Sequence, residues 1–386
     1  MYGVFLANFV GFIEPGLMST EAQLLALPTA PIDHVMFQLT AWFVFDKANT
    51  LFAFLFGLGF YLQMSRLSAR GVDFERVYLR RLTVLLVFGI LHTVFLWCWD
   101  ILQLYALAGF LLFALRGLRD RTMLVLGLVL ALFGRSAYEL ASVSLSLETW
   151  HGFPAVFSEA AALERQALSA AGDYGGLVAA FGRMTLVDWL LNGSILGWLL
   201  YALGRFLIGA WVGRRGWLQD IPRYLEDFRR VRNIALPAGL LAEGLLMLVR
   251  YYGNTDRLPE WPHWVALAEA LHLLAVPVLA AGYLSAIVVG LHSARLRRWL
   301  APFGHAGRMA LTNYVAQSVF FGFVLFGVGP GLALAGKIGV MQVILLVTLA
   351  YAAQIALSRL WLQRLRYGPL EWVWRRLTYG SLSKSQ

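Results

Sequence analysis

The sequence predicts an all-α fold, a polytopic bundle of about ten transmembrane helices. Of its 386 residues, 59% are hydrophobic and only 14% are charged, whereas an average soluble domain has about a quarter of its residues charged. The mean hydropathy is +0.66. Apolar runs of about 20 residues, long enough to cross a bilayer as a helix, follow one another along the chain. We therefore expect one integral-membrane domain over residues 1–386, with the lipid bilayer as its surroundings.

The first predicted span, residues 1–13, is apolar from its start and too short to cross a bilayer, so we expect a truncated span or a natural chain that begins upstream of Met1. The other nine spans are expected at residues 42–64, 82–99, 101–115, 122–142, 186–212, 234–252, 265–291, 309–328 and 338–360. The expected domain thus has N-terminal helices over residues 1–142, a mixed polar segment over 143–183, C-terminal helices over 184–360 and an amphipathic tail over 361–386.

The basic residues indicate how the spans are oriented. Of the 32 lysines and arginines, 23 fall in loops 65–81, 116–121, 213–232 and 291–300 and in the chain from residue 359 onward. These are alternate connections, and the positive-inside rule places them in the cytoplasm. Both termini are then cytoplasmic and the segment 143–183 is extracytoplasmic. The net charge of +10 is explained by this topology, so we expect no nucleic-acid partner.

Motifs for metal and nucleotide chemistry are missing from the sequence. It contains neither HExxH nor GxSxG spacing, and its single cysteine, Cys98, cannot form a cysteine-based metal cluster. We expect no metal site and no permanently bound cofactor.

One ionisable residue lies inside an apolar run where lipid would surround it. His92 follows the cytoplasmic end of its predicted span by about ten residues, roughly 15 Å of helix. Burial favours the neutral imidazole, which can accept a proton and serve as a general base; the alternative is a structural histidine bonded to a neighbouring helix. Asp100, eight positions later and roughly 80° around a continuous helix, is not an automatic partner. Asp100 is either a second site residue or the N-cap of the next helix.

Other polar residues sit near the starts of predicted spans. Asp46, Lys47 and Asn49 are expected at the membrane interface, where the first two form either a surface pair or part of a cavity lining. Arg135 and Glu139 are four positions apart on one span, so we expect them to neutralise each other.

Polar residues also gather in the last third of the chain. Arg308, Asn313 and Gln317 share one broad helical face that should line the protein interior. That face either lines a ligand cavity or joins helices. His272 and Glu269, three positions apart, form a further inward-facing pair candidate.

Five stretches of the sequence resemble one family in the same order. They are KANTLFAFLFGLGF (47–60), RRLTVLLVFGILH (80–92), DILQLYALAG (100–109), GRMALTNYVAQS (307–318) and YGPLEWVWRRLTYG (367–380). Together they resemble the YeiB family of bacterial inner-membrane proteins, which carry a C-terminal domain of unknown function. The family usually begins with a segment containing an Asp and an LRG-like run, which this chain lacks.

The resemblance implies distant kinship with transmembrane acyltransferases and a multi-pass protein of the bacterial inner membrane. Such enzymes pass an acyl group from cytoplasmic acyl-CoA to an acceptor, here unknown, and use a histidine within the membrane. Only His92 carries over as that histidine, with Arg80 and Arg81 as contacts to the phosphates of CoA. Planar guanidinium groups suit phosphate oxygens, although the same pair is also explained as positive-inside charge.

The alternative to an acyltransferase is a small-molecule transporter or permease without catalytic chemistry. An acyltransferase needs His92 at the end of a tunnel open to the basic cytoplasmic loops, whereas a transporter needs a midplane cavity that is gated on both sides. A membrane protein that only binds partners is a third reading, and a second copy of the chain is a candidate partner.

Overall fold

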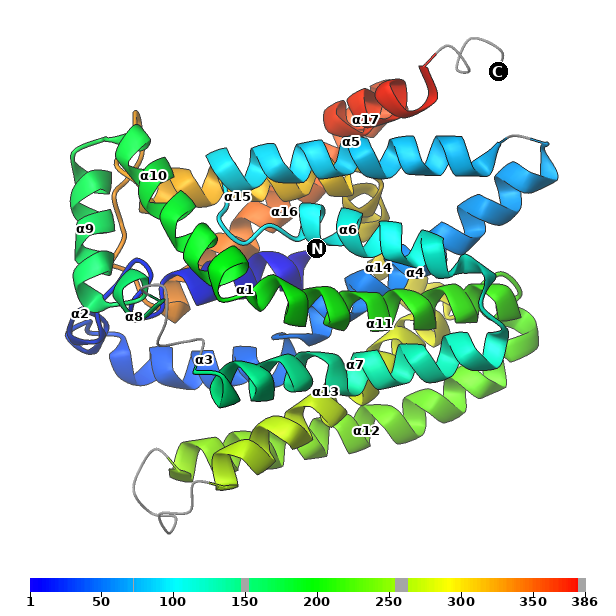
Figure 1. Cartoon of the computed structure of the whole chain (residues 1–386), viewed down its shortest axis with the longest axis horizontal. Coiled ribbons are helices and arrows are strands. Elements are labelled where there is room, and N and C mark those ends of the chain that lie inside the picture. Colours follow the sequence, from blue (N-terminus) through cyan, green and yellow to red (C-terminus); the bar gives the residue numbers. More distant parts are fainter. Residues whose placement is uncertain (72, 147–152, 254–262, 381–386) are drawn as a thin grey trace.

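The computed structural model describes residues 1–71, 73–146, 153–253 and 263–380, and every regular element in these ranges is helical (Figure 1). The helices are α1 (Tyr2–Phe12), α2 (Glu21–Leu25), α3 (Ala30–Phe43), α4 (Lys47–Ala69), α5 (Phe74–Phe95), α6 (Ile101–Ala114), η1 (Leu115–Gly117), α7 (Asp120–Ser144), α8 (Phe153–Val156), α9 (Glu159–Ala170), α10 (Tyr174–Thr185), η3 (Leu186–Leu191), α11 (Ser194–Arg215), α12 (Ile221–Gly253), α13 (His263–Leu291), α14 (Ala294–Arg308), α15 (Ala310–Leu325), α16 (Val340–Arg364) and α17 (Pro369–Tyr379).

The predicted fold class, an all-α membrane bundle, is confirmed. Within the described ranges, seven helical segments are long and apolar enough to cross a membrane, and three shorter apolar helices accompany them. The long segments are 30–69, 74–95, 120–142, 194–215, 221–249, 271–291 and 340–364, and the short ones are 2–12, 101–117 and 310–325. Each of the ten predicted spans therefore coincides with an apolar helix, and three of them are shorter than a full crossing.

Two predicted spans are interrupted. The second was expected as one helix from Trp42, but α3 ends at Phe43 and α4 begins at Lys47, with Asp46 between them in the left-handed region at φ 60°. The sixth was expected from Leu186, but that stretch is a π-helix, and Gly193 separates it from α11. Both breaks place polar side chains beside the middle of the bundle.

Small residues bring the central helices together. A Cβ added to Gly57 of α4 would lie 2.0 Å from the carbonyl oxygen of Phe206, and one added to Gly209 of α11 would lie 2.0 Å from that of Phe54. These two helices can therefore touch backbone to backbone, which is the usual way in which small residues pack membrane helices. Helix α7 packs against the other side of α11.

The connections alternate between the two ends of the bundle (Figure 1). The α4–α5, α6–α7 and α11–α12 connections, all basic, gather at one end, and α2 and α9 lie at the opposite end. Helices α12 and α13 run side by side along one flank, while α5 and α17 pack together on the opposite flank. This arrangement agrees with the alternation that the basic loops predict.

Helix α9 belongs to the segment predicted to be extracytoplasmic, and its Arg165 attaches it to the N-terminal part of the chain. Arg165 is 2% exposed, and its guanidinium donates to the carbonyl oxygens of Gly16 and Leu17, both at 2.7 Å. Residues 147–152 of this segment lie outside the described ranges.

Candidate functional site

His92 lies near the end of α5, further along the helix than the sequence suggested. The helix begins at Phe74 rather than at Leu82, so His92 is 18 positions into it, about 27 Å along the axis. The basic residues before Leu82 are themselves helical, while the expected depth of about 15 Å in the membrane stays a prediction. The imidazole is buried, with 3% of the residue exposed.

Asp100 is the partner that the sequence did not assign to His92. The ring atom Nδ1 of His92 lies 3.0 Å from Asp100 Oδ1, approached obliquely and out of line with the ring N–H direction. Asp100 is also the N-cap of α6, because its Oδ2 accepts from the backbone N–H of Gln103 at 3.3 Å. The N-cap reading of Asp100 is thus confirmed, its role as a site residue stays a prediction, and no part of the residue is exposed.

The turn between α5 and α6 explains the contact. The backbone N–H groups of Leu96 and Trp97 both donate to the carbonyl oxygen of His92, at 2.8 Å, and close the helix there. Gly89 lets α6 fold back closely, since a Cβ at this position would lie 2.2 Å from the backbone nitrogen of Gln103. The sequence estimate assumed one straight helix, on which the two side chains lie apart. The chain instead turns back between α5 and α6, and this turn brings them together.

Helix α15 completes what we call the His92 cluster: His92, Asp100, Tyr314 and Ser318. His92 Nε2 lies 3.0 Å from Ser318 Oγ, and the Tyr314 hydroxyl donates to Asp100 Oδ1 at 2.9 Å. A hydroxyl, an imidazole and a carboxylate thus stand in a row, the order in which a general base is placed between a reacting hydroxyl and an orienting acid.

A second buried group, the His272 cluster, consists of Asp46, Lys47, Glu243 and His272. Lys47 Nζ lies 2.9 Å from Glu243 Oε2. His272 bridges the two carboxylates, with Nδ1 3.0 Å from Glu243 Oε1 and Nε2 3.1 Å from Asp46 Oδ2. The expectation of an interfacial pair between Asp46 and Lys47 was wrong, because both residues pair with helices α12 and α13. Lys47 and Glu243 are only 1% and 3% exposed.

One polar cavity adjoins the His272 cluster, and a second cavity of mixed lining shares part of its wall. One, of about 130 Å³, is lined by Asp46 and His272, and the other, of about 150 Å³, by Asp188 and Asn192 among others. Both share Arg135 and Glu139, whose predicted ion pair is confirmed at 2.7 Å. Arg135 also lies 3.8 Å from Asp46. The predicted partner Glu269 has a side chain outside the described part of the structure.

Comparisons with known proteins show what the chain is similar to. Residues 212–381 match the family described as "Protein of unknown function (DUF418)". The chain is 29% identical to the uncharacterized protein YxaH of Bacillus subtilis (strain 168), over 99% of this chain and 92% of the relative. It is 27% identical to an uncharacterized 39.9 kDa protein from the amylase 3' region of Bacillus acidopullulyticus, over 98% of this chain and 91% of the relative. It is 29% identical to the uncharacterized protein YeiB of Escherichia coli (strain K12), over 86% of this chain and 81% of the relative.

The chain is thus similar to YeiB and its relatives over most of its length. No solved structure matches it. The comparisons thus agree with the resemblance carried by the five sequence stretches, while the relatives' names assign no activity.

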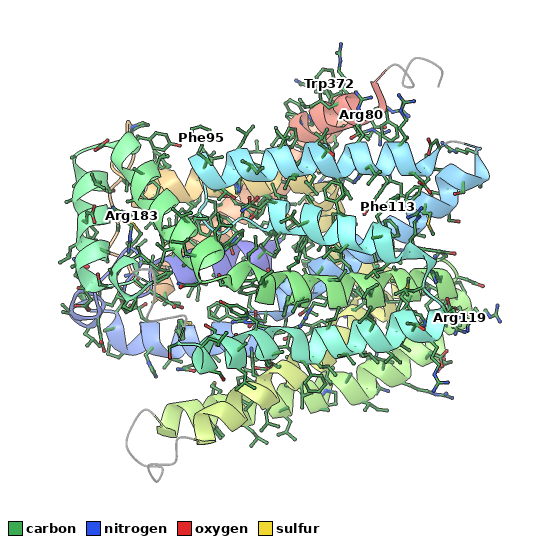
Figure 2. The ribbon with its side chains drawn as sticks, in the orientation of Figure 1. Arg80, Phe95, Phe113, Arg119, Arg183 and Trp372 are labelled. Carbon is green, nitrogen blue, oxygen red and sulfur yellow. The ribbon has the colours of Figure 1, made fainter. Side chains whose placement is uncertain are left out.

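In this YeiB-like protein the two arginines predicted to contact CoA lie under the tail helix α17. The Arg81 guanidinium stacks 3.9 Å from the Trp374 ring centre, and Trp374 Nε1 donates to the Arg81 carbonyl oxygen at 3.1 Å. Figure 2 shows Arg80 beside α17 and Phe95 toward the other end of α5. Arg81 and His92 are eleven positions apart, about 16 Å of helix. The arginines and the His92 cluster therefore occupy different parts of α5.

The remaining predicted lining residues bond to other helices. Asn313 donates to Ser358 Oγ at 3.0 Å and Gln317 to Gln354 Oε1 at 3.0 Å, so this face of α15 joins α16. Arg308 is exposed and donates to a backbone carbonyl after α16. Asn49 of α4 has a buried Oδ1 without a hydrogen-bond partner. A cavity-lining role for these residues stays a prediction.

Four residues of this YeiB-like protein were not singled out by the sequence. Glu243 and Arg205 are lone charges within apolar runs, and the reasoning applied to His92 would have found them. Ser318 and Tyr314 lie within a quoted family stretch, but nothing in the sequence indicates that they face α5. That information comes only from the packing of α15.

Proposed function

We propose that the protein is an acyltransferase of the bacterial inner membrane that moves an acyl group from cytoplasmic acyl-CoA to an acceptor hydroxyl or amine. The observation that carries this proposal is the row of Ser318, His92 and Asp100, with both ring nitrogens of His92 3.0 Å from a neighbouring oxygen. The Asp100 carboxylate, 3.0 Å from Nδ1, stabilises the imidazolium that forms during the reaction.

The chemistry uses His92 first as a base and then as an acid. Nε2 takes the proton from the acceptor as its oxygen or nitrogen attacks the thioester carbonyl. The carbon–sulfur bond then breaks, and the proton passes to the departing CoA thiolate. In the acceptor-free protein Ser318 occupies the place next to Nε2. Because His92 is only 3% exposed, the reactants reach it after a movement of α15, and the closed cluster keeps bulk water away.

Binding of CoA is the first test. Calorimetric titration of the purified protein with acetyl-CoA should show saturable micromolar binding that is lost in Arg80→Ala/Arg81→Ala and kept in His92→Ala. Arg229→Ala/Arg230→Ala is the matched control, because it removes two exposed arginines from another predicted cytoplasmic helix. Transfer of the acetyl group should be lost in His92→Ala. The absence of binding at millimolar acetyl-CoA would refute the proposal.

The His272 cluster favours transport as a second candidate function. Its two carboxylates are joined through one imidazole, and two of its members line a polar cavity. Buried ionisable groups beside a polar cavity are typical of proton-coupled transporters. Vesicles that contain the protein and have an imposed pH gradient should then accumulate a polar solute. Asp46→Asn should abolish this uptake, and His92→Ala should not. Equal uptake by both variants would exclude this cluster from transport.

A further inference from the structure

Arg205 is a buried cation that neither the His92 cluster nor the His272 cluster contains. It lies in the middle of α11 and is 2% exposed. Its Nε donates to Thr50 Oγ1 at 2.9 Å, and its Nη1 donates to the carbonyl oxygens of Ala131 and Tyr201 at 3.2 and 3.0 Å. Its Nη2 is buried without a hydrogen-bond partner. No ion pair within the described residues joins Arg205 to a carboxylate.

A charge in this position is costly unless something balances it. Neutral oxygens satisfy three of the guanidinium bonds, and the Tyr201 ring centre lies 3.2 Å from the guanidinium carbon. These contacts are favourable but do not cancel the charge, and an unpaired donor in a membrane bundle adds its own desolvation cost. Buried charges within membrane helices usually mark a ligand or ion site. The question is what kind of ligand the surroundings of Arg205 accept.

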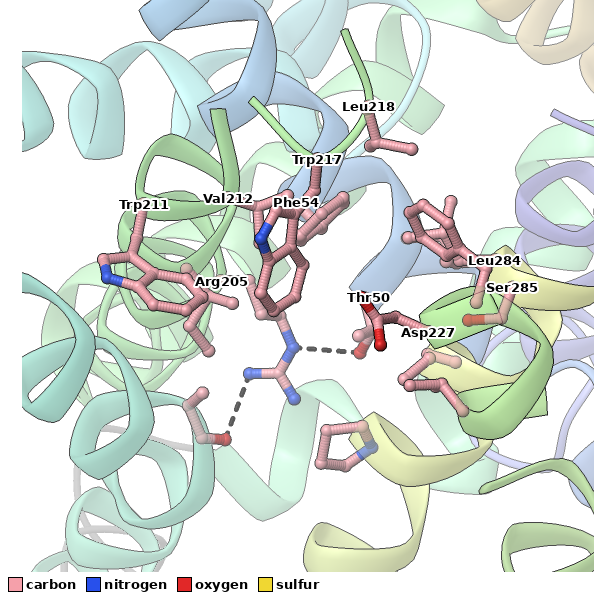
Figure 3. Close-up of a pocket in the computed structure, with 18 of the residues that line it drawn as sticks. Thr50, Phe54, Arg205, Trp211, Val212, Trp217, Leu218, Asp227, Leu284 and Ser285 are labelled. Carbon is pink, nitrogen blue, oxygen red and sulfur yellow. Dashed lines mark hydrogen bonds between the residues drawn. The ribbon is translucent and has the colours of Figure 1, made fainter. Parts of the chain in front are cut away.

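The surroundings are an apolar cavity of about 250 Å³ between α4, α11, α12 and α13 (Figure 3). Arg205 and Thr50 belong to its wall, which is almost entirely apolar, and the other lining residues are mostly aliphatic or aromatic. They include Phe54, Trp211, Trp217, Phe228, Pro277 and Leu284. Asp227, also in the wall, is 65% exposed and lies 3.9 Å from Arg230, so its charge is directed to solvent.

We propose that this cavity binds a single-chain carboxylic acid, with its carboxylate on Arg205 and its alkyl chain among the apolar residues. A carboxylate supplies both the missing charge and an acceptor for Nη2. The alkyl chain gains free energy by leaving water for an apolar wall. A cavity of about 250 Å³ is at the small end of ligand pockets, so it suits one chain of medium length and excludes a two-chain phospholipid.

This inference does not rest on the proposed acyl transfer, because the cavity and the His92 cluster are built from different helices. An acyltransferase, a transporter and a protein without either activity could each carry this site. Its test therefore measures binding alone and leaves the reaction aside.

The experiment is equilibrium binding of radiolabelled octanoate and octanol to the full-length protein in neutral-lipid nanodiscs. The two probes share a chain and differ in the charged head. We expect saturable octanoate binding that Arg205→Gln weakens at least tenfold, while octanol binding changes less than twofold. Arg119→Gln is the control, because Arg119 lies at the end of the bundle in Figure 2 and does not line the cavity.

A second variant addresses the cavity without removing the buried charge. Leu284→Trp places a larger ring in the wall and should lower the affinity for octanoate and octanol alike, by tenfold or more. The proposal is overturned if Leu284→Trp binds both probes as the wild type does. It is also overturned if Arg205→Gln weakens both probes equally, or if an anionic phospholipid in the nanodisc displaces octanoate.

Discussion

The ion pair between Lys47 and Glu243 allows a quantitative test of the His272 cluster. The two side chains are 1% and 3% exposed, and Nζ lies 2.9 Å from Oε2. Removing one partner of a buried pair typically costs about 3–5 kcal/mol, because the other charge is left uncompensated. His272, 3.0 Å from Glu243, can take up a proton and balance part of that charge. We therefore expect Lys47→Met to lower the free energy of unfolding by about 3 kcal/mol.

A double-mutant cycle separates the pair from its surroundings. Adding Glu243→Leu to Lys47→Met removes the stranded carboxylate, so the double variant should recover at least about 1 kcal/mol relative to the sum of the single variants. Unfolding in mixed detergent micelles can be followed with a thiol-reactive dye, because Cys98 is the single cysteine and is 2% exposed. Lys337→Met, at an exposed lysine, is the control and should change stability by less than about 0.5 kcal/mol. Additive single variants, or a Lys47→Met protein as stable as the wild type, would contradict this account of the cluster.

Three further predictions concern other parts of the bundle. Gly89→Ala would place a Cβ 2.2 Å from a backbone atom of α6, so it should lower stability by about 1–3 kcal/mol. Gly59→Ala, which meets nothing within 4 Å, should be neutral in the same denaturation assay. Burial raises the pKa of the Glu14 carboxyl from 4.5 to about 7, so the folded state favours the protonated acid. Stability is then greatest at low pH and falls as the pH rises through about 7, by at most about 3 kcal/mol; a Glu14→Gln protein that keeps this pH dependence would refute the assignment. Glu371 accepts from the first backbone N–H groups of α15 at 2.7 and 3.0 Å. Glu371→Gln should therefore lower the free energy of unfolding by about 1 kcal/mol and speed hydrogen exchange at those amides. Unchanged exchange would argue against the cap.

The fold could be predicted from the sequence because its determinants are local. The lengths of the apolar runs predict ten helices, and the basic loops predict which end of each helix faces the cytoplasm. The break before α4 escaped prediction because Asp46 adopts φ 60°, a conformation in which a residue other than glycine is uncommon. A sequence pattern that reads as one continuous span gives no sign of it.

The sites could be predicted only in part, because their contacts cross between helices. His92 was identified from its apolar surroundings alone, but its bond to Ser318 joins residues 226 positions apart. His272 was paired with a neighbour three positions away, whereas its partners come from α12 and from the break before α4. Spacing rules describe one helix, and they carry no information about which helices meet.

A chain of hydrogen bonds connects the Arg205 cavity to the His272 cluster. Arg205 donates to Thr50 Oγ1 at 2.9 Å, Thr50 and Tyr201 share a bond of 2.8 Å, and the Tyr201 hydroxyl donates to the Asp46 carbonyl oxygen at 3.1 Å. Because the Tyr201 hydroxyl donates to Asp46, the Thr50 hydroxyl is the donor in its bond with Tyr201. Each group in the chain therefore donates to the next, from Arg205 to Asp46.

Because this chain of hydrogen bonds ends on the backbone carbonyl oxygen of Asp46, it predicts that a carboxylate on Arg205 and the backbone that positions the Asp46 side chain influence each other. Asp46→Asn should change octanoate affinity severalfold in a protein with Tyr201. In Tyr201→Phe, which removes the central hydroxyl and keeps the ring, the same substitution should change the affinity less than twofold. Binding in the four proteins of this cycle measures the coupling directly. Equal effects of Asp46→Asn in both backgrounds would show that the two sites act separately.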